Sequence, residues 1–261
     1  MTRMILFLCF VIILGGLAEK WREGTGITVI PLVTESPPPL SQAFDETPDK
    51  REVSTKESTW YAIQLAAFEN KEAADELALS YQSRGAAGVV LFAGNRYRVL
   101  ASVYSDKEDA QAVRNQLKST HEIDSYIYEM VIPEMTLKIS GVKGQIDVLA
   151  AAMQFLRDGL YEIQKISVAL DQKEANRQDV ANNIKILAMR ANELNRLFET
   201  RFANPKHTTA QRLQELLKMY IALETFENSQ DSGAVVFAAK LKELTISMIE
   251  KTQAQFKEIM Q

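Results

Sequence analysis

Five side chains between positions 60 and 102 have the types and the spacing of a surface that binds carbohydrate: Trp60, Gln64, Arg96, Arg98 and Ser102. Within each strand-like stretch they are separated by even numbers of residues, and such residues share one face of a sheet. An indole offers a flat apolar surface to a pyranose ring, while amides and guanidiniums donate hydrogen bonds to hydroxyls and acetamido carbonyls. These residue types would suit a sugar chain, but on composition alone an ordinary solvated face of a sheet is the favoured interpretation.

These residues lie in a motif that occurs twice, at an offset of 36 positions. Residues 59–70 read TWYAIQLAAFEN, and residues 95–106 read NRYRVLASVYSD. In each copy, alternating apolar residues predict a strand that is followed by a helix. We expect Asn70 to cap the first helix, and Ser105 with Glu108 to form a capping box for the second.

Two further strands are predicted at residues 89–92 and 126–131, with a turn at Gly94 and Asn95. The order is then β-α-β-β-α-β, so we expect a ferredoxin-like α+β module over residues 60–132, with a four-stranded antiparallel sheet and both helices on one face. The residues expected to face these helices are Ile63, Leu65, Val99 and Ala101. The residues expected on the open face are Trp60, Ala62, Gln64, Arg96, Arg98, Leu100 and Ser102.

The sequences IQLAAF, from Ile63, and YRVLASVY, from Tyr97, resemble the two strand motifs of the SPOR domain, a peptidoglycan-binding module. The resemblance covers about residues 60–131. It implies binding to glycan strands that lack stem peptides, at sites where septal wall is being remodelled. The residues that it assigns to the glycan are Gln64 and Arg98. Ala66, Ser102 and Val103 stand where the family has glycine, glycine and proline, and these side chains narrow the approach of a glycan to the backbone.

The N-terminal residues 1–22 begin with a short apolar run that fits two interpretations. It is either an uncleaved membrane anchor, with Lys20, Trp21 and Arg22 at the interface, or a signal peptide that is cleaved after Ala18. A buried helix of a soluble protein is a third, weaker alternative, because the run has no polar face. Both membrane interpretations place the rest of the chain outside the cytoplasm, as a single-pass or a secreted protein.

Residues 23–59 are rich in proline and poor in large apolar side chains, and five of the seven prolines lie between positions 31 and 59. Such a segment cannot bury enough surface to order itself. We therefore expect a disordered linker between the membrane and the folded module.

After Pro133 the apolar residues recur every three or four positions, which predicts amphipathic helices over residues 140–261. Breaks near Asp171, Pro205 and Gly233 divide this part into four helices. Short breaks between long helices favour an up-down four-helix bundle. A coiled coil that dimerises is the alternative, because the same spacing suits a seam between two chains.

The composition argues against several classes of function. A net charge of −4 gives no electrostatic reason to bind nucleic acid. Cys9, His121 and His207 are the only cysteine and histidines, so no metal-ligand spacing exists and no metal or other cofactor is expected. The sequence has neither a nucleophile elbow nor a phosphate-binding loop. We expect no enzymatic activity, and a wall hydrolase would lack a catalytic constellation.

The sequence thus predicts a cell-envelope protein that binds peptidoglycan at division or sporulation septa and presents a helical interaction domain there. That domain would meet a protein partner or a second copy of the chain. The alternative is a structural protein that acts through the helices, with a module that has lost glycan binding.

Overall fold

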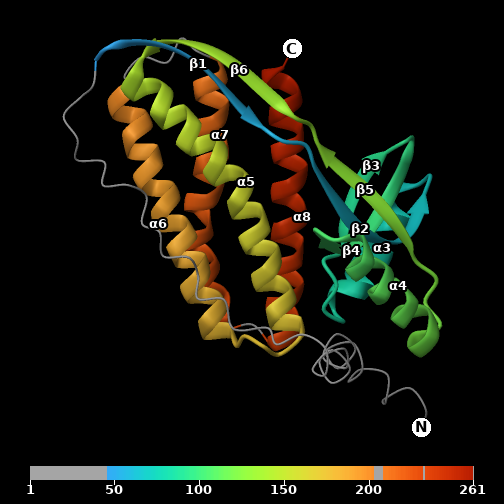
Figure 1. The fold of residues 1–261 in the computed structure, drawn as a ribbon. Coiled ribbons are helices and arrows are strands. Elements are labelled where there is room, and N and C mark those ends of the chain that lie inside the picture. Colours follow the sequence, from blue (N-terminus) through green and yellow to red (C-terminus); the bar gives the residue numbers. More distant parts are fainter. Residues whose placement is uncertain (1–45, 203–207, 232, 261) are drawn as a thin grey trace.

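The chain is an α+β protein in which two sheets contact a set of long helices (Figure 1). The computed structural model describes residues 46–202, 208–231 and 233–260. The expected membrane segment at residues 1–22, and the linker as far as residue 45, lie outside the described residues. Within the described ranges, no helix combines the length and the apolarity that a bilayer crossing requires.

The larger sheet has four strands in the order β3-β4-β2-β5, and each neighbouring pair is antiparallel. Two helices pack on one of its faces, around the fully buried Ile63 and Val99. We call residues 58–132 the sheet unit. Its elements are β2 (Ser58–Phe68), α3 (Lys71–Gln82), β3 (Val89–Ala93), β4 (Arg96–Tyr104), α4 (Lys107–His121) and β5 (Tyr126–Ile132).

Local capping explains where the two helices of the sheet unit begin. Asn70 accepts a hydrogen bond from the Ala73 amide at 3.2 Å, as expected for an N-cap. The expected cap of the second helix was wrong by one residue, because Asp106 accepts the amides of Glu108 and Asp109 there. An aspartate carboxylate is as good a cap as serine and also favours the positive end of the helix dipole.

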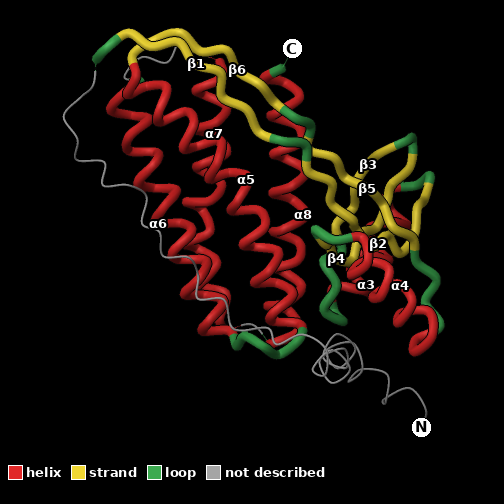
Figure 2. Tube along the Cα trace, viewed as in Figure 1, coloured by secondary structure: helices red, strands yellow, loops and turns green. Residues whose placement is uncertain are grey.

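The second sheet is a two-stranded ribbon made by β1 (Pro48–Thr55) and β6 (Met135–Val142). Their pairing runs from Pro48 opposite Val142 to Thr55 opposite Met135, so the ribbon continues the β2–β5 ladder beyond a short break. Figure 2 shows both strands leaving the sheet unit and lying across one end of the helices. Residues 48–55 and 58–59 therefore lie in strands and not in the disordered linker that we expected over residues 23–59. A polar segment of low apolar content is ordered here because a distant strand supplies its hydrogen bonds.

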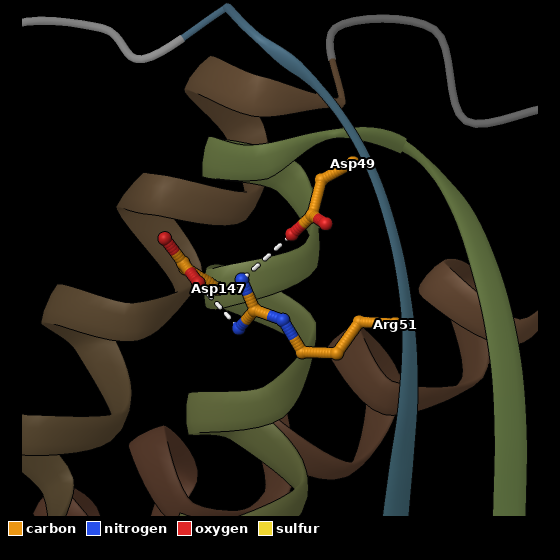
Figure 3. Close-up of polar contacts among 3 residues, drawn as sticks. All are labelled: Asp49, Arg51 and Asp147. Carbon is orange, nitrogen blue, oxygen red and sulfur yellow. Dashed lines mark hydrogen bonds and ion pairs between the residues drawn. The ribbon is translucent and has the colours of Figure 1, made fainter.

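An ion pair joins the ribbon to the helices (Figure 3). Arg51 on β1 donates to Asp147 and to Asp49, with both distances at 2.8 Å. Asp147 belongs to α5 (Lys143–Asp171), the helix that follows β6 directly. The ribbon therefore contacts the helices through a guanidinium held between two carboxylates.

The remaining helices are α6 (Arg177–Arg201), α7 (Thr208–Ile221) and α8 (Ala234–Ile259), with a 3-10 helix, η2 (Ala222–Asp231), before α8. Each of α5 and α7 contacts both α6 and α8, and we call residues 143–260 the helical half. Asn176 and Asp179 form a capping box at the start of α6. Helix α5 ends at Asp171 and α8 begins after Gly233, where the sequence predicts breaks, whereas the break predicted near Pro205 lies outside the described residues.

Gly159 allows α5 and α7 to approach closely, and we expect Gly159→Ala to destabilise the protein by about 1–3 kcal/mol. An added Cβ would meet the Tyr220 ring at 2.6 Å. That ring is fully buried, and its hydroxyl donates to the Leu156 carbonyl at 3.0 Å, so it cannot move aside cheaply. Denaturant unfolding would measure the loss. Gly144→Ala is the matched control in the same helix, since its Cβ would meet the far end of the Arg201 side chain at 3.2 Å, and we expect a smaller loss of stability than for Gly159→Ala.

The helical half covers the face of the sheet that α3 and α4 leave free. Helix α8 contacts β3, β4 and β5, and buried sheet residues share one apolar core with α5 and α8. The expectation of an open face was therefore wrong for the middle of the sheet. The reason is visible in the residues of that face, because Ala62, Leu100 and Met130 are apolar and need a cover.

Candidate functional site

Trp60 lies in the covered part of the sheet. The side chain is fully buried, and its ring centroid is 4.7 Å from that of Tyr161 on α5. Among the described residues, its indole nitrogen has no hydrogen-bond partner. In this arrangement Trp60 cannot offer its ring to a sugar, in contrast to the expectation from the sequence.

Gln64 and Arg98, which the sequence predicts as glycan ligands, contact one another at the end of the sheet away from Trp60. The guanidinium of Arg98 donates to the Gln64 side-chain oxygen at 2.7 Å and to the Ala93 carbonyl at 3.1 Å. It also lies over the ring of Tyr128, 4.9 Å from the centroid. We call Gln64, Arg98 and Tyr128 the Arg98 cluster. Gln64 is buried, while Arg98 and Tyr128 are half-buried.

Arg96 and Ser102 do not join this cluster. Arg96 is exposed and pairs with Glu69 at 3.5 Å, an exposed ion pair that contributes little to stability. Ser102 is buried and pairs with Ile63, whose side chain faces α3 and α4. The expectation that Ser102 lies on the open face of the sheet was therefore wrong.

A β-bulge explains the position of Ser102. The pairing of β2 with β4 shifts between Ile63 and Gln64 and again before Ala66, so that Gln64 pairs with Leu100. A bulge inserts a residue and breaks the alternation of side chains between the two faces. Simple alternation from Arg98 could not reveal this shift.

The predicted residues did not include two tyrosines of β5. Tyr128 pairs with Ala62, and Tyr126 pairs with Gln64, so both belong to the face that carries the Arg98 cluster. Tyr126 is 64% exposed, which leaves its ring free for a ligand. Their spacing of two residues in the predicted last strand was the available indication.

A buried ion pair lies where the sheet unit meets two helices. Lys242 on α8 donates to Asp171 at the end of α5 at 2.8 Å and to the Gly85 carbonyl of the sheet unit at 2.9 Å. Burial raises the pKa of Asp171 above its ordinary value, although the charge of Lys242 opposes this shift. A cleft of about 460 Å³ lies beside the pair and is lined by charges of both signs, among them Arg84 and Glu174.

The raised pKa of Asp171 predicts a dependence of stability on pH. The native protein binds a proton at Asp171 more readily than the unfolded chain does, so this carboxyl contributes less stability as the pH rises through its native pKa. We expect the stability of the wild type, relative to Asp171→Asn, to fall from about pH 4 towards neutral pH. Urea unfolding across that range would give the slope of the free energy of unfolding against pH for the wild type and for Asp171→Asn. Parallel slopes would contradict the prediction.

The described residues contain no group of three or more histidine, cysteine, aspartate or glutamate side chains placed to hold a metal ion. The Arg98 cluster and Tyr126 supply hydrogen-bonding side chains and aromatic rings. Such a site binds a polar ligand with apolar ring faces.

Comparison with known proteins agrees with the geometry of the sheet unit. Residues 57–129 match the family model of the SPOR domain. The matched segment begins one residue before β2 and ends within β5. No curated protein matches the chain, and no solved structure does. The match covers neither the ribbon nor the helical half.

Proposed function

Residues 57–129 form a SPOR domain, and on that premise we propose that the protein recognises peptidoglycan glycan strands that lack stem peptides. SPOR domains bind peptidoglycan and occur in cell division. The observation that carries the proposal for this chain is the contact between Gln64 and Arg98, since the resemblance assigns both residues to the glycan and they lie 2.7 Å apart.

The chemistry of the Arg98 cluster suits such a ligand. Removal of a stem peptide leaves a carboxylate on the lactyl group of muramic acid, and a guanidinium binds a carboxylate through charge-assisted hydrogen bonds. Gln64 holds one side of the Arg98 guanidinium, which fixes its orientation before a ligand arrives. The exposed ring of Tyr126 offers the apolar surface that Trp60 does not.

We further propose that the protein acts at division or sporulation septa, held at the membrane by residues 1–22 or secreted after cleavage. The helical half would meet a protein partner or a second copy of the chain there. Because buried residues of the sheet unit and of the helical half share one apolar core, the glycan would position both together.

A second candidate function is that of a structural protein whose SPOR domain no longer binds glycan. The complete burial of Trp60 beneath α5 favours it. In that case the sheet unit would be a scaffold for the helical half.

Cosedimentation of the detergent-solubilised full chain with purified sacculi would separate the two candidates. An amidase removes stem peptides and leaves glycan strands without them, which we call denuded glycan. If the chain recognises denuded glycan, the fraction of the protein that sediments should increase after the sacculi are treated with an amidase. Equal, negligible sedimentation with both preparations would contradict glycan recognition and favour the structural candidate.

A further inference from the structure

The helical half divides the glycan-facing side of the sheet into a covered and an accessible part. The covered part holds Trp60, Ala62 and Leu100, all fully buried. The accessible part is the end of the sheet with the Arg98 cluster and the exposed Tyr126. A glycan strand that binds at the accessible part and continues along this face of the sheet would meet the helices that cover the rest of it.

The covering interface contains polar groups that a permanent apolar core would avoid. The indole N–H of Trp60 lacks a partner among the described residues, and a buried, unsatisfied donor destabilises the state that contains it. Lys242 and Asp171 form a buried ion pair, and a buried pair is weak evidence for stability because both charges lose their hydration. Gln253 on α8 donates to the Val131 carbonyl at 2.7 Å. These groups would be solvated or bound to a ligand if the two surfaces separated.

The connection between the halves has the form of a hinge. The chain leaves the ribbon for the sheet unit at Lys56–Glu57 and returns at Pro133–Glu134. These two crossings lie side by side, because Thr55 pairs with Met135 before the break and Ser58 pairs with Ile132 after it. Rotation there would move the sheet unit without breaking a strand pair in either sheet. The ribbon itself stays with the helices through Arg51 and Asp147 (Figure 3).

From these observations we propose that the helical half is a cover that regulates the SPOR domain: α5 and α8 occlude Trp60 in the absence of ligand, and a denuded glycan strand displaces them. The proposal rests on the proposed glycan-binding function. The Arg98 cluster makes the first contact in the closed form. Separation then gives the indole of Trp60 a sugar ring to stack against and hydroxyl oxygens to accept its N–H.

Lys242→Met tests the cover. It removes the bond that joins α8 to Gly85 of the sheet unit, and it leaves Asp171 without its cation. The uncompensated carboxyl is buried while the halves are closed and would be hydrated when they separate, so the open form becomes more populated. We expect it to raise the apparent affinity for amidase-treated sacculi on the order of tenfold, because apparent affinity rises with the fraction of competent protein. Arg212→Met is the matched control: Arg212 joins α7 to Gln255 and Glu258 of α8, and its replacement should leave the affinity unchanged. Circular dichroism would verify that both variants are folded.

A second measurement does not depend on that variant's folding. Trp21 and Trp60 are the two tryptophans of the chain, so the emission of the Trp21→Phe protein reports on Trp60. We expect saturating, soluble denuded glycan to change the Trp60 emission and its quenching by acrylamide. Two results together would overturn the cover: glycan binds without changing the emission or the quenching of Trp60, and Lys242→Met binds with the affinity of the wild type. Glycan recognition at the Arg98 cluster would still stand in that case. If neither the wild type nor Lys242→Met bound amidase-treated sacculi, both glycan recognition and the cover would be overturned. Binding by Lys242→Met but not by the wild type would support the cover.

Discussion

Replacing Trp60 by alanine is expected to lower the free energy of unfolding by about 3–5 kcal/mol, the range for removal of a fully buried large aromatic side chain. Trp60 is 0% exposed in a core shared by the sheet and the helices, and its ring lies against Tyr161. Its removal would leave a cavity between β2 and α5. Denaturant unfolding, followed by circular dichroism, would measure the effect.

Two further substitutions identify the cause of that loss. Trp60→Phe keeps most of the apolar contact and removes the unpaired N–H, so we expect its cost to stay below about 1.5 kcal/mol. Phe92→Ala removes an aromatic ring from the same sheet, but Phe92 is 57% exposed, and the loss should be about 1 kcal/mol or less. If Trp60→Ala destabilised the protein no more than Phe92→Ala, the helical half would not cover the sheet.

Replacing Arg98 by alanine is expected to weaken binding to amidase-treated sacculi about tenfold or more. A hydrogen bond to a charged group contributes roughly 1.5–3 kcal/mol, and 1.4 kcal/mol corresponds to a factor of ten in affinity. Arg98 also orients Gln64 and covers Tyr128, so the variant loses more than one contact of the site. Cosedimentation at several protein concentrations would give the ratio of affinities.

The matched control for Arg98 is Arg114→Ala, which removes the same charge from α4 on the opposite side of the sheet. Arg114 is bonded to its neighbour Asn115 and has no contact with the Arg98 cluster. If both variants lost affinity equally, binding would depend on overall charge rather than on the cluster. A normal affinity for Arg98→Ala would show that the glycan binds elsewhere.

Local patterns in the sequence were sufficient to predict the elements of the sheet unit. Alternation around Ile63 and Val99 identified the strands that face α3 and α4, and the turn at Gly94 and Asn95 has the positive φ angles, 58° and 60°, that a tight hairpin requires. The sequence also predicted that Gln64 and Arg98 lie on one face of the sheet, and their side-chain hydrogen bond agrees with this. These features depend on residues close in the sequence or on a repeated motif.

The features that were missed depend on contacts between distant segments. Alternation cannot detect the bulge that places Ser102 opposite Ile63. The ordering of β1 depends on β6, some ninety residues away, and the composition of β1 alone suggests a linker. Leu100 and Met130 did indicate a cover, since a solvated sheet face rarely carries so many large apolar side chains.

The most direct test of glycan recognition by the sheet unit is hydrogen exchange of the full chain with and without soluble denuded glycan. The account predicts slower exchange where the Arg98 cluster and Tyr126 lie, at residues 64–66, 96–100 and 126–128, and no comparable change with glycan that retains its stem peptides. Unchanged exchange in these three segments while glycan is bound would contradict it, and would place the binding site outside the Arg98 cluster.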